Sequence, residues 1–260
     1  MTVAEMARAL YDAHRTRTPI PPFTDVEPEL GMEDGYAVQQ ELLALLLADG
    51  DQVVGHKVGL TSASMQQAMA IGSPDYGPVL ASSVYRDGAE ILLNNFVSPK
   101  IEAEIVFLLR DRLVGPGITT TAARTAIAGV VAGMEIIDSR IEGWRVKLAD
   151  TVADMASHGA LAVSSRVVPI DGIDTRLIGM TLTRNGELVD TGAGAATLGD
   201  PLAAVAWLAN VLGRNGIALE PGHLIMSGAL HAAVPIAAGD VFRAEFDRLG
   251  PVTVRVGESA

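Results

Sequence analysis

The chain of 260 residues contains no cysteine, and aromatic residues make up only 4% of it. Without cysteine the protein forms no disulfide, has no thiolate nucleophile and offers no sulfur ligand to zinc. Hydrophobic residues nevertheless account for 49% of the sequence. A chain of this length and hydrophobicity buries a substantial core, so we do not expect it to be disordered.

Basic residues are also scarce. Lysine and arginine number 19 against 31 aspartate and glutamate residues, which gives a formal net charge of −12. This charge argues against nucleic acid or an anionic membrane surface as a partner. A small anionic substrate would need a local cation, and a bound metal would supply one.

Long apolar stretches are missing as well. Residues 1–8 lack the basic start and the continuous apolar run of a signal peptide, and the apolar run at 42–47 is too short to span a membrane. We therefore expect a cytoplasmic protein with no membrane partner.

Three glutamates are candidates for a functional site. Glu102 and Glu104 alternate with hydrophobic residues in segment 98–109, which predicts a strand with both carboxylates on one face, about 6.6 to 7 Å apart. Glu135 lies within the apolar run 130–137. A buried carboxylate is unfavourable unless it is paired or bound to metal, so the three predict a site for a divalent cation. The alternative is a solvated strand face for the first two and an ion pair with Arg140 for the third.

Further polar residues are candidates for chemistry. Lys57 lies between glycines in an expected strand. Its ammonium either reaches the surface or, with a lowered pKa, acts in catalysis or binds the substrate. Asp75 lies in a predicted turn at 73–78, either bonding its own backbone or acting as a general base. Ser227 and Gly228 belong to a small-residue loop that can present N–H groups to an anion. His158 is expected to be a satisfied or exposed histidine without a chemical role.

The remaining patterns predict an α+β fold. Helices are expected at 2–15 and 32–49, and a short helix capped by Ser62 at 63–70. Asn185-Gly186 predicts a type I′ hairpin, and Asp200-Pro201 a helix start. Because strands dominate after residue 50, we predict an N-terminal helical arm (1–50) followed by a catalytic β-rich domain (51–260) built on a rolled, barrel-like mixed sheet. The glycines at 192–199 lack the spacing of a dinucleotide loop, so NAD binding is not expected.

Several segments together resemble the 2-hydroxypenta-2,4-dienoate hydratase and 2-oxo-3-hexenedioate (4-oxalocrotonate) decarboxylase family, within the fumarylacetoacetate hydrolase superfamily. The resemblance covers nearly the whole chain and rests on segments 55–62, 74–77, 99–105, 135–140, 150–154, 191–196 and 239–240. It implies a domain of the fumarylacetoacetate hydrolase C-terminal type. Two positions depart from the family pattern, because Met155 stands where asparagine is usual and Asp200 where histidine is common.

The resemblance also implies a site and a reaction. Mg²⁺ or Mn²⁺ would be held by the residues at Glu102, Glu104 and Glu135, Lys57 and Asp75 would match the acid–base residues, and Leu60, Ser227 and Gly228 would contact the substrate. The implied reaction is hydration of a 2-hydroxydienoate from aromatic meta-cleavage to 4-hydroxy-2-oxopentanoate or a homologue.

The sister decarboxylation and a non-catalytic scaffold role are the alternatives, and the stretch 141–148 favours the hydratase. A homo-oligomer is expected, and association with a sister decarboxylase or a downstream aldolase stays open.

Overall fold

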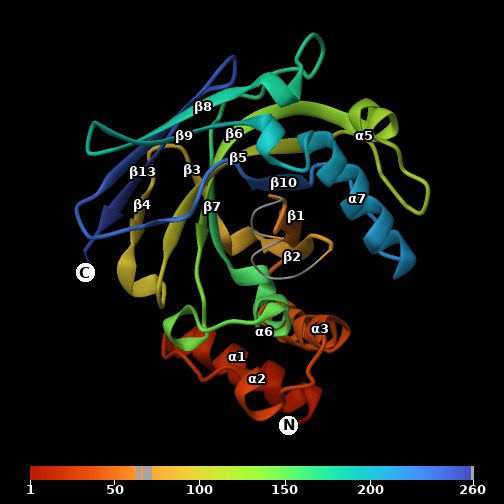
Figure 1. Cartoon of the computed structure of the whole chain (residues 1–260), viewed down its shortest axis with the longest axis vertical. Helices are drawn as coiled ribbons and strands as arrows, with labels where there is room; N and C mark the ends of the chain where they lie inside the picture. Colours follow the sequence, from red (N-terminus) through yellow and green to blue (C-terminus); the bar gives the residue numbers. More distant parts are fainter. Residues whose placement is uncertain (63–65, 67–71, 259–260) are drawn as a thin grey trace.

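The computed structural model describes residues 1–62, 66 and 72–258, which form two mixed β-sheets with helices around them (Figure 1). The short helix expected at 63–70 falls almost wholly outside the described residues. Within the described part of the chain, no helix is both long and apolar enough to cross a membrane.

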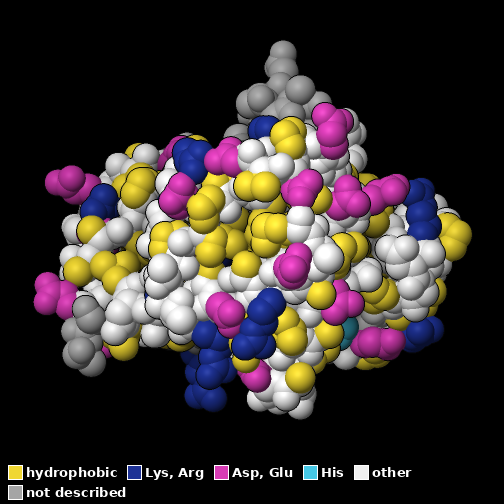
Figure 2. Space-filling model, turned by 90° about the horizontal axis from the view of Figure 1, so that it is seen from below, with side chains coloured by type: hydrophobic (Ala, Val, Ile, Leu, Met, Phe, Trp, Pro, Cys, Tyr) yellow, Lys and Arg dark blue, Asp and Glu magenta, His cyan; other side chains and the backbone are white. Residues whose placement is uncertain are grey.

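Three helices open the chain: α1 (Val3–Thr16), α2 (Phe23–Val26) and α3 (Met32–Ala48). The first and third were predicted, and the short α2 was not. Thr2 caps α1 by accepting a hydrogen bond from the Glu5 amide. These helices pack beside α6 (Leu148–Ala153) at the lower end of the molecule in Figure 1. Seen from below, that end shows acidic side chains interleaved with hydrophobic ones (Figure 2).

The N-terminal helices share a hydrophobic cluster with later parts of the chain. Leu10 of α1 and Leu42 of α3 belong to one cluster with Leu80, Ile141 and Met155. The helices are therefore packed onto the body of the protein by side chains that flank the functional site described below.

The first sheet has the strand order β2-β1-β10-β5-β6-β7-β3, with β11 paired to β5. Its strands are β1 (Val53–Gly59), β2 (Asp75–Leu80), β3 (Val84–Arg86), β5 (Lys100–Leu109), β6 (Ile127–Ile137), β7 (His158–Val163), β10 (Leu224–Ala229) and β11 (Val234–Pro235).

The second sheet has the order β4-β13-β12-β8-β9. Its strands are β4 (Glu90–Leu92), β8 (Gly179–Arg184), β9 (Glu187–Ala193), β12 (Val241–Phe246) and β13 (Gly250–Gly257). Because these strands pair with one another instead of extending the first sheet, the described strands form no closed barrel, and that part of the prediction was wrong.

The main core lies between the two sheets and the helix α7 (Pro201–Arg214). Phe107 of β5 and Phe242 of β12 are both fully buried in it. Burying large apolar side chains from both sheets stabilises this arrangement by about 2 to 3 kcal/mol for each side chain. The long strands β5 and β6 are thereby fixed in the middle of the first sheet.

Segments with strong local sequence signals fold as predicted. Asn185 and Gly186 both have positive φ (55° and 86°) between β8 and β9, as a type I′ turn requires. Asp200 caps α7 by accepting a hydrogen bond from the Leu202 amide. A further short helix is α5 (Thr120–Ala126), whose N-terminus is capped by the Thr119 hydroxyl.

Candidate active site

The three predicted glutamates meet on adjacent strands. β5 and β6 pair antiparallel with Glu102 directly opposite Glu135, and Glu104 follows two residues along the same face of β5. One carboxylate oxygen from each residue lies within 4.8 Å of those of the other two. The alternation on β5 and the pairing with β6 thus assemble a cluster of three carboxylates.

The cluster lies mostly out of solvent. Glu135 is fully buried, Glu104 is 1% exposed and Glu102 is half-buried, so the alternative of a solvated strand face is wrong. Burial, followed by repulsion from Glu135, raises the pKa of Glu102 to about 7 and that of Glu104 well above its ordinary value. Carboxylates this close oppose one another's ionisation, and a cation among them would offset that repulsion.

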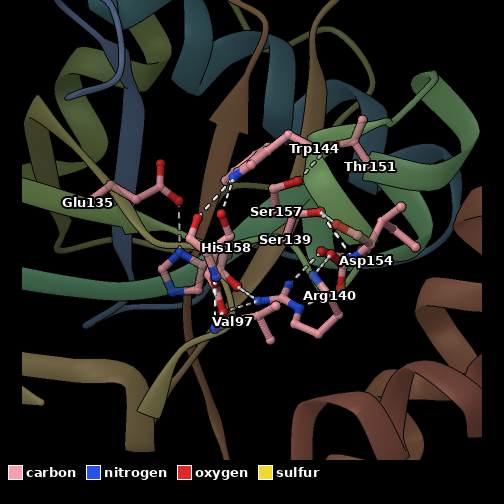
Figure 3. Close-up of polar contacts among 12 residues, drawn as sticks. Val97, Glu135, Ser139, Arg140, Trp144, Thr151, Asp154, Ser157 and His158 are labelled. Carbon is pink, nitrogen blue, oxygen red and sulfur yellow. Dashed lines mark hydrogen bonds and ion pairs between the residues drawn. The ribbon is translucent and has the colours of Figure 1, made fainter. Parts of the chain in front are cut away.

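Glu135 itself behaves differently. Burial alone would raise its pKa, but Lys57 and His158 outweigh burial and leave the pKa of this carboxyl below its ordinary value. Its Oε1 atom lies 2.8 Å from His158 Nδ1. Figure 3 marks this contact with a dashed line. Its Oε2 atom is buried without a hydrogen bond, and its nearest cationic partner is Lys57 Nζ at 3.5 Å.

The donor set fits a divalent cation. Carboxylate oxygens are the ligands that Mg²⁺, Mn²⁺ and Ca²⁺ prefer. The buried Glu135 Oε2 has a free lone pair, and the raised pKa values of Glu102 and Glu104 reflect negative charge that a cation would offset. These three residues are therefore suited to hold a divalent metal ion.

Lys57 reaches the same site from the neighbouring part of the sheet. β1, which carries it, lies between β2 and β10, and the side chain is buried. Its Nζ atom donates a hydrogen bond to the Ala156 carbonyl at 2.9 Å. Burial would lower the pKa of the ammonium, but Glu135 and the other nearby carboxylates keep that pKa above its ordinary value. The ammonium is therefore not at the surface, and its pKa is raised and not lowered. Its role towards a substrate stays a prediction.

Asp75 completes the group of buried charges. It begins strand β2 opposite Gly59 of β1, so the predicted turn at this residue was wrong. Burial raises the pKa of Asp75 to about 6, although Lys57 acts in the opposite direction. A Cβ at Gly59 would lie 2.1 Å from Asp75 Oδ1 and 3.3 Å from Lys57 Nζ. Only glycine there lets the carboxylate and the ammonium approach the same point.

Two of the residues predicted to contact the substrate lie in a strand and not in the expected loop. Ser227 and Gly228 lie in strand β10 and not in a loop, because β10 pairs with β1 and β5 up to this point. The Gly228 amide donates to Glu104 Oε2 at 2.9 Å and the Ser227 hydroxyl donates to the Ile105 carbonyl. Leu60 is half-buried with a positive φ of 55° at the end of β1. The Gly228 amide thus orients a glutamate.

His158 is a residue that the sequence interpretation missed. It is buried at the start of β7, where it pairs in register with Ile137 of β6. Its imidazole joins Glu135 to the Ser83 hydroxyl, which lies 3.1 Å from Nε2. No local pattern around His158 indicates this contact, since it depends on pairing between β6 and β7.

Arg140, which was considered as the partner of Glu135, instead pairs with Asp154. Its Nε atom lies 2.5 Å from Asp154 Oδ1, and both side chains are buried. This pair forms the centre of the network drawn in Figure 3.

Two mixed sheets with a buried cluster of three carboxylates, an ammonium and an aspartate define a fold with a candidate divalent-metal centre. The sequence profile described as Fumarylacetoacetate (FAA) hydrolase C-terminal matches residues 49–257, and the chain belongs to this family.

Characterised relatives span nearly the full length of the chain. It is 41% identical over 248 residues to a 2-keto-4-pentenoate hydratase of Paraburkholderia xenovorans (strain LB400), covering 95% of this chain and 92% of the relative. It is 37% identical over 258 residues to a 2-hydroxyhexa-2,4-dienoate hydratase of Comamonas testosteroni, covering 98% of both.

A solved structure is similar as well. The 4-oxalocrotonate decarboxylase from Pseudomonas putida G7, complexed with magnesium and adipate, superimposes with a TM-score of 0.95 at 36% identity, covering 98% of this chain and 97% of that one.

Proposed function

We propose that this protein is a metal-dependent hydratase. It adds water to 2-hydroxypenta-2,4-dienoate, or a substituted homologue, to give 4-hydroxy-2-oxopentanoate or its counterpart in the degradation of aromatic compounds. The observation that carries the proposal is the convergence of Glu102, Glu104 and Glu135 with Lys57 and Asp75. The similarity to two hydratases over almost the whole chain supports it.

The reaction needs two proton transfers and one addition. A proton reaches C5 as the enol O–H is lost, which leaves a C3–C4 double bond conjugated to the 2-oxo group. Water then gives its oxygen to C4 and a proton to C3. Each step needs a group that donates or accepts a proton inside a site that excludes bulk water.

Three carboxylates on β5 and β6 would hold the cation, for which we propose Mg²⁺ or Mn²⁺. When bound, such an ion supplies Lewis acidity that withdraws electrons from the carboxylate and 2-oxygen of the keto acid. The Gly228 amide keeps the Glu104 carboxylate in place.

Lys57 and Asp75 are proposed to move the protons. With a pKa raised to about 6, Asp75 is mostly ionised at neutral pH and accepts a proton from the attacking water. Lys57, which the surrounding carboxylates keep protonated, donates a proton to substrate carbon. Leu60, at the strained end of β1, and the segment at Ser227 are the proposed contacts for the rest of the substrate.

Decarboxylation of 2-oxo-3-hexenedioate is the second candidate. The specific observation in its favour is the TM-score of 0.95 with 4-oxalocrotonate decarboxylase, at an identity close to that of the hydratases. The same carboxylate cluster would hold a cation that stabilises the negative charge of the enolate left when CO₂ departs.

One experiment separates these functions. The protein is incubated with Mg²⁺ or Mn²⁺ and either 2-hydroxypenta-2,4-dienoate or 2-oxo-3-hexenedioate, with EDTA-treated protein as the control, and products are identified by mass. We expect the first substrate to gain one water only when metal is present. Loss of CO₂ from the second substrate alone would assign the decarboxylase, and no turnover of either would favour a non-catalytic scaffold partner.

The setting of the enzyme is part of the proposal. We infer a cytoplasmic homo-oligomer in which the helices of residues 1–50 provide contact surface, while residues 51–260 carry catalysis. Hydrophobic side chains among acidic ones on the face that bears these helices support a contact there (Figure 2). Association with a sister decarboxylase or a downstream aldolase is tested by co-purification.

A further inference from the structure

Three consecutive residues next to the candidate active site have left-handed backbone. Met155, Ala156 and Ser157 have φ values of 56°, 52° and 56°, and all three are buried. L-residues other than glycine normally adopt this conformation singly, at a cost of about 1 to 2 kcal/mol each. Residues 155–157, called the left-handed turn below, therefore need strong support from their surroundings.

The left-handed turn fixes two groups of the site. The carbonyl of its central residue, Ala156, accepts the hydrogen bond from Lys57 Nζ at 2.9 Å. The residue that directly follows the turn is His158, whose Nδ1 lies 2.8 Å from Glu135 Oε1. A right-handed path would redirect the Ala156 carbonyl and shift the start of β7, so the direction of the turn determines where both side chains are held.

Arg140 joins the two ends of the turn, as Figure 3 shows. Its guanidinium donates to the Asp154 carbonyl before the turn at 2.8 Å and to the His158 carbonyl after it at 2.9 Å. Its Nε atom donates to the Asp154 carboxylate, which also accepts from the Arg140 backbone amide at 2.8 Å. Arg140 is only 4% exposed and Asp154 is fully buried, so water does not compete for these contacts.

Two other contacts belong to the same arrangement. The hydroxyls of Thr151 and Ser157 lie 2.8 Å apart, which ties the last residue of the turn to α6. A Cβ at Gly77 of β2 would lie 2.2 Å from the Met155 carbonyl oxygen, so glycine there lets the turn pack against β2.

We propose that Arg140 is a positioning residue for catalysis: it holds the left-handed turn so that the Ala156 carbonyl orients Lys57 and the His158 imidazole orients Glu135. This inference rests on the roles proposed above for Lys57 and Glu135. The planar fork of arginine is essential, because it reaches a side chain and two separate carbonyls at once. A lysine keeps the charge but has a single nitrogen.

The test compares Arg140→Lys with a matched control, Arg124→Lys. Arg124 also uses its guanidinium to join a loop, donating to the carbonyls of Ile170 and Ile173 at 2.7 and 3.1 Å. It lies in α5 before the start of β6, whereas Glu135 lies eight residues into β6, roughly 25 Å along the strand.

We expect Arg140→Lys to lower kcat on 2-hydroxypenta-2,4-dienoate at saturating Mn²⁺ by tenfold or more, with KM changed less than threefold. The Kd for Mn²⁺, measured by calorimetry, should rise about tenfold, as is common when the partner of a metal ligand is misplaced. Arg124→Lys should leave kcat and the Mn²⁺ Kd within twofold of the wild type, even if it lowers Tm by as much as Arg140→Lys does.

Wild-type kcat and Mn²⁺ affinity in Arg140→Lys, or an equal loss in Arg124→Lys, would overturn the proposal. If the wild type hydrates no dienoate, the proposed function fails, and the Mn²⁺ Kd alone decides the positioning role. If Arg140→Lys does not fold, the nearly isosteric Thr151→Val decides: a twofold to fivefold loss of kcat supports the role of the turn, and unchanged kcat and Mn²⁺ Kd contradict it.

Discussion

Replacing Glu135 by glutamine keeps the shape of the side chain and removes its charge. In the structure, Glu135 Oε2 lies 3.5 Å from Lys57 Nζ in a buried site. At an effective dielectric constant of about 20, two unit charges at that distance interact by about 5 kcal/mol. A doubly charged ion held by the same oxygen interacts more strongly, so we expect Mg²⁺ or Mn²⁺ affinity to fall at least 100-fold, which corresponds to about 2.8 kcal/mol.

Thermal unfolding with and without metal measures this loss independently of turnover. At a free metal concentration of about 100 times Kd, binding stabilises the wild type by about 2.7 kcal/mol. For a chain of this size that raises Tm by roughly 5 to 11 °C. In Glu135→Gln the same concentration only equals the new Kd, and the stabilisation falls to about 0.4 kcal/mol, or about 1 to 2 °C.

The control is Glu245→Gln, which removes an exposed carboxylate of β12. It should keep the full metal-dependent rise in Tm and wild-type hydratase activity, whereas Glu135→Gln should lose both. A metal-dependent rise in Tm in Glu135→Gln as large as in the wild type would refute the assignment of this carboxylate as a ligand.

Further predictions follow from individual residues. Ala156→Gly should raise the free energy of unfolding by about 1 kcal/mol, because glycine relieves a positive φ, whereas Ala149→Gly, in α6, should lower it by a similar amount. Urea unfolding measures both changes. A change in the free energy of unfolding of the same sign in both variants would contradict the left-handed conformation at Ala156. His158→Gln should lower kcat by about 10- to 100-fold while Tm changes little, and wild-type kinetics would exclude a role in orienting its carboxylate partner. Burial, with repulsion from His223, lowers the pKa of His56 to about 3. The unfolded chain takes up this proton near pH 6.5, so folding stability falls as pH drops below that value. The stability of the wild type relative to His56→Phe should decrease by about 1.4 kcal/mol between pH 8 and 5.5 in denaturant titrations, and a constant difference would show that His56 titrates normally.

Elements specified by local chemistry could be predicted from the sequence. The Asn185-Gly186 turn needs two residues that accept positive φ, and the cap at Asp200 needs only its own helix. The carboxylate cluster was also accessible, because alternation sets the face of Glu102 and Glu104, and the apolar run around Glu135 indicates burial.

Features that depend on pairing between distant segments were not accessible. Gly228 was expected in a loop because its neighbours are small, yet it lies in β10, at the irregularity between the Met226 and Ala229 pairs with β5, a strand from much earlier in the chain. The barrel prediction failed for the same reason, since strand order in two sheets is not encoded in any one segment. His158 has its role only once β7 pairs with β6, and Arg140 has its role only once it reaches the residues on both sides of the left-handed turn.

The most direct measurement is the anomalous scattering of a crystal soaked in Mn²⁺. We expect a single Mn²⁺ peak within about 2.0 to 2.4 Å of oxygens from Glu102, Glu104 and Glu135, with Lys57 Nζ still hydrogen-bonded to the Ala156 carbonyl. Mn²⁺ bound elsewhere, or three carboxylates that remain without a metal at saturating Mn²⁺, would contradict it.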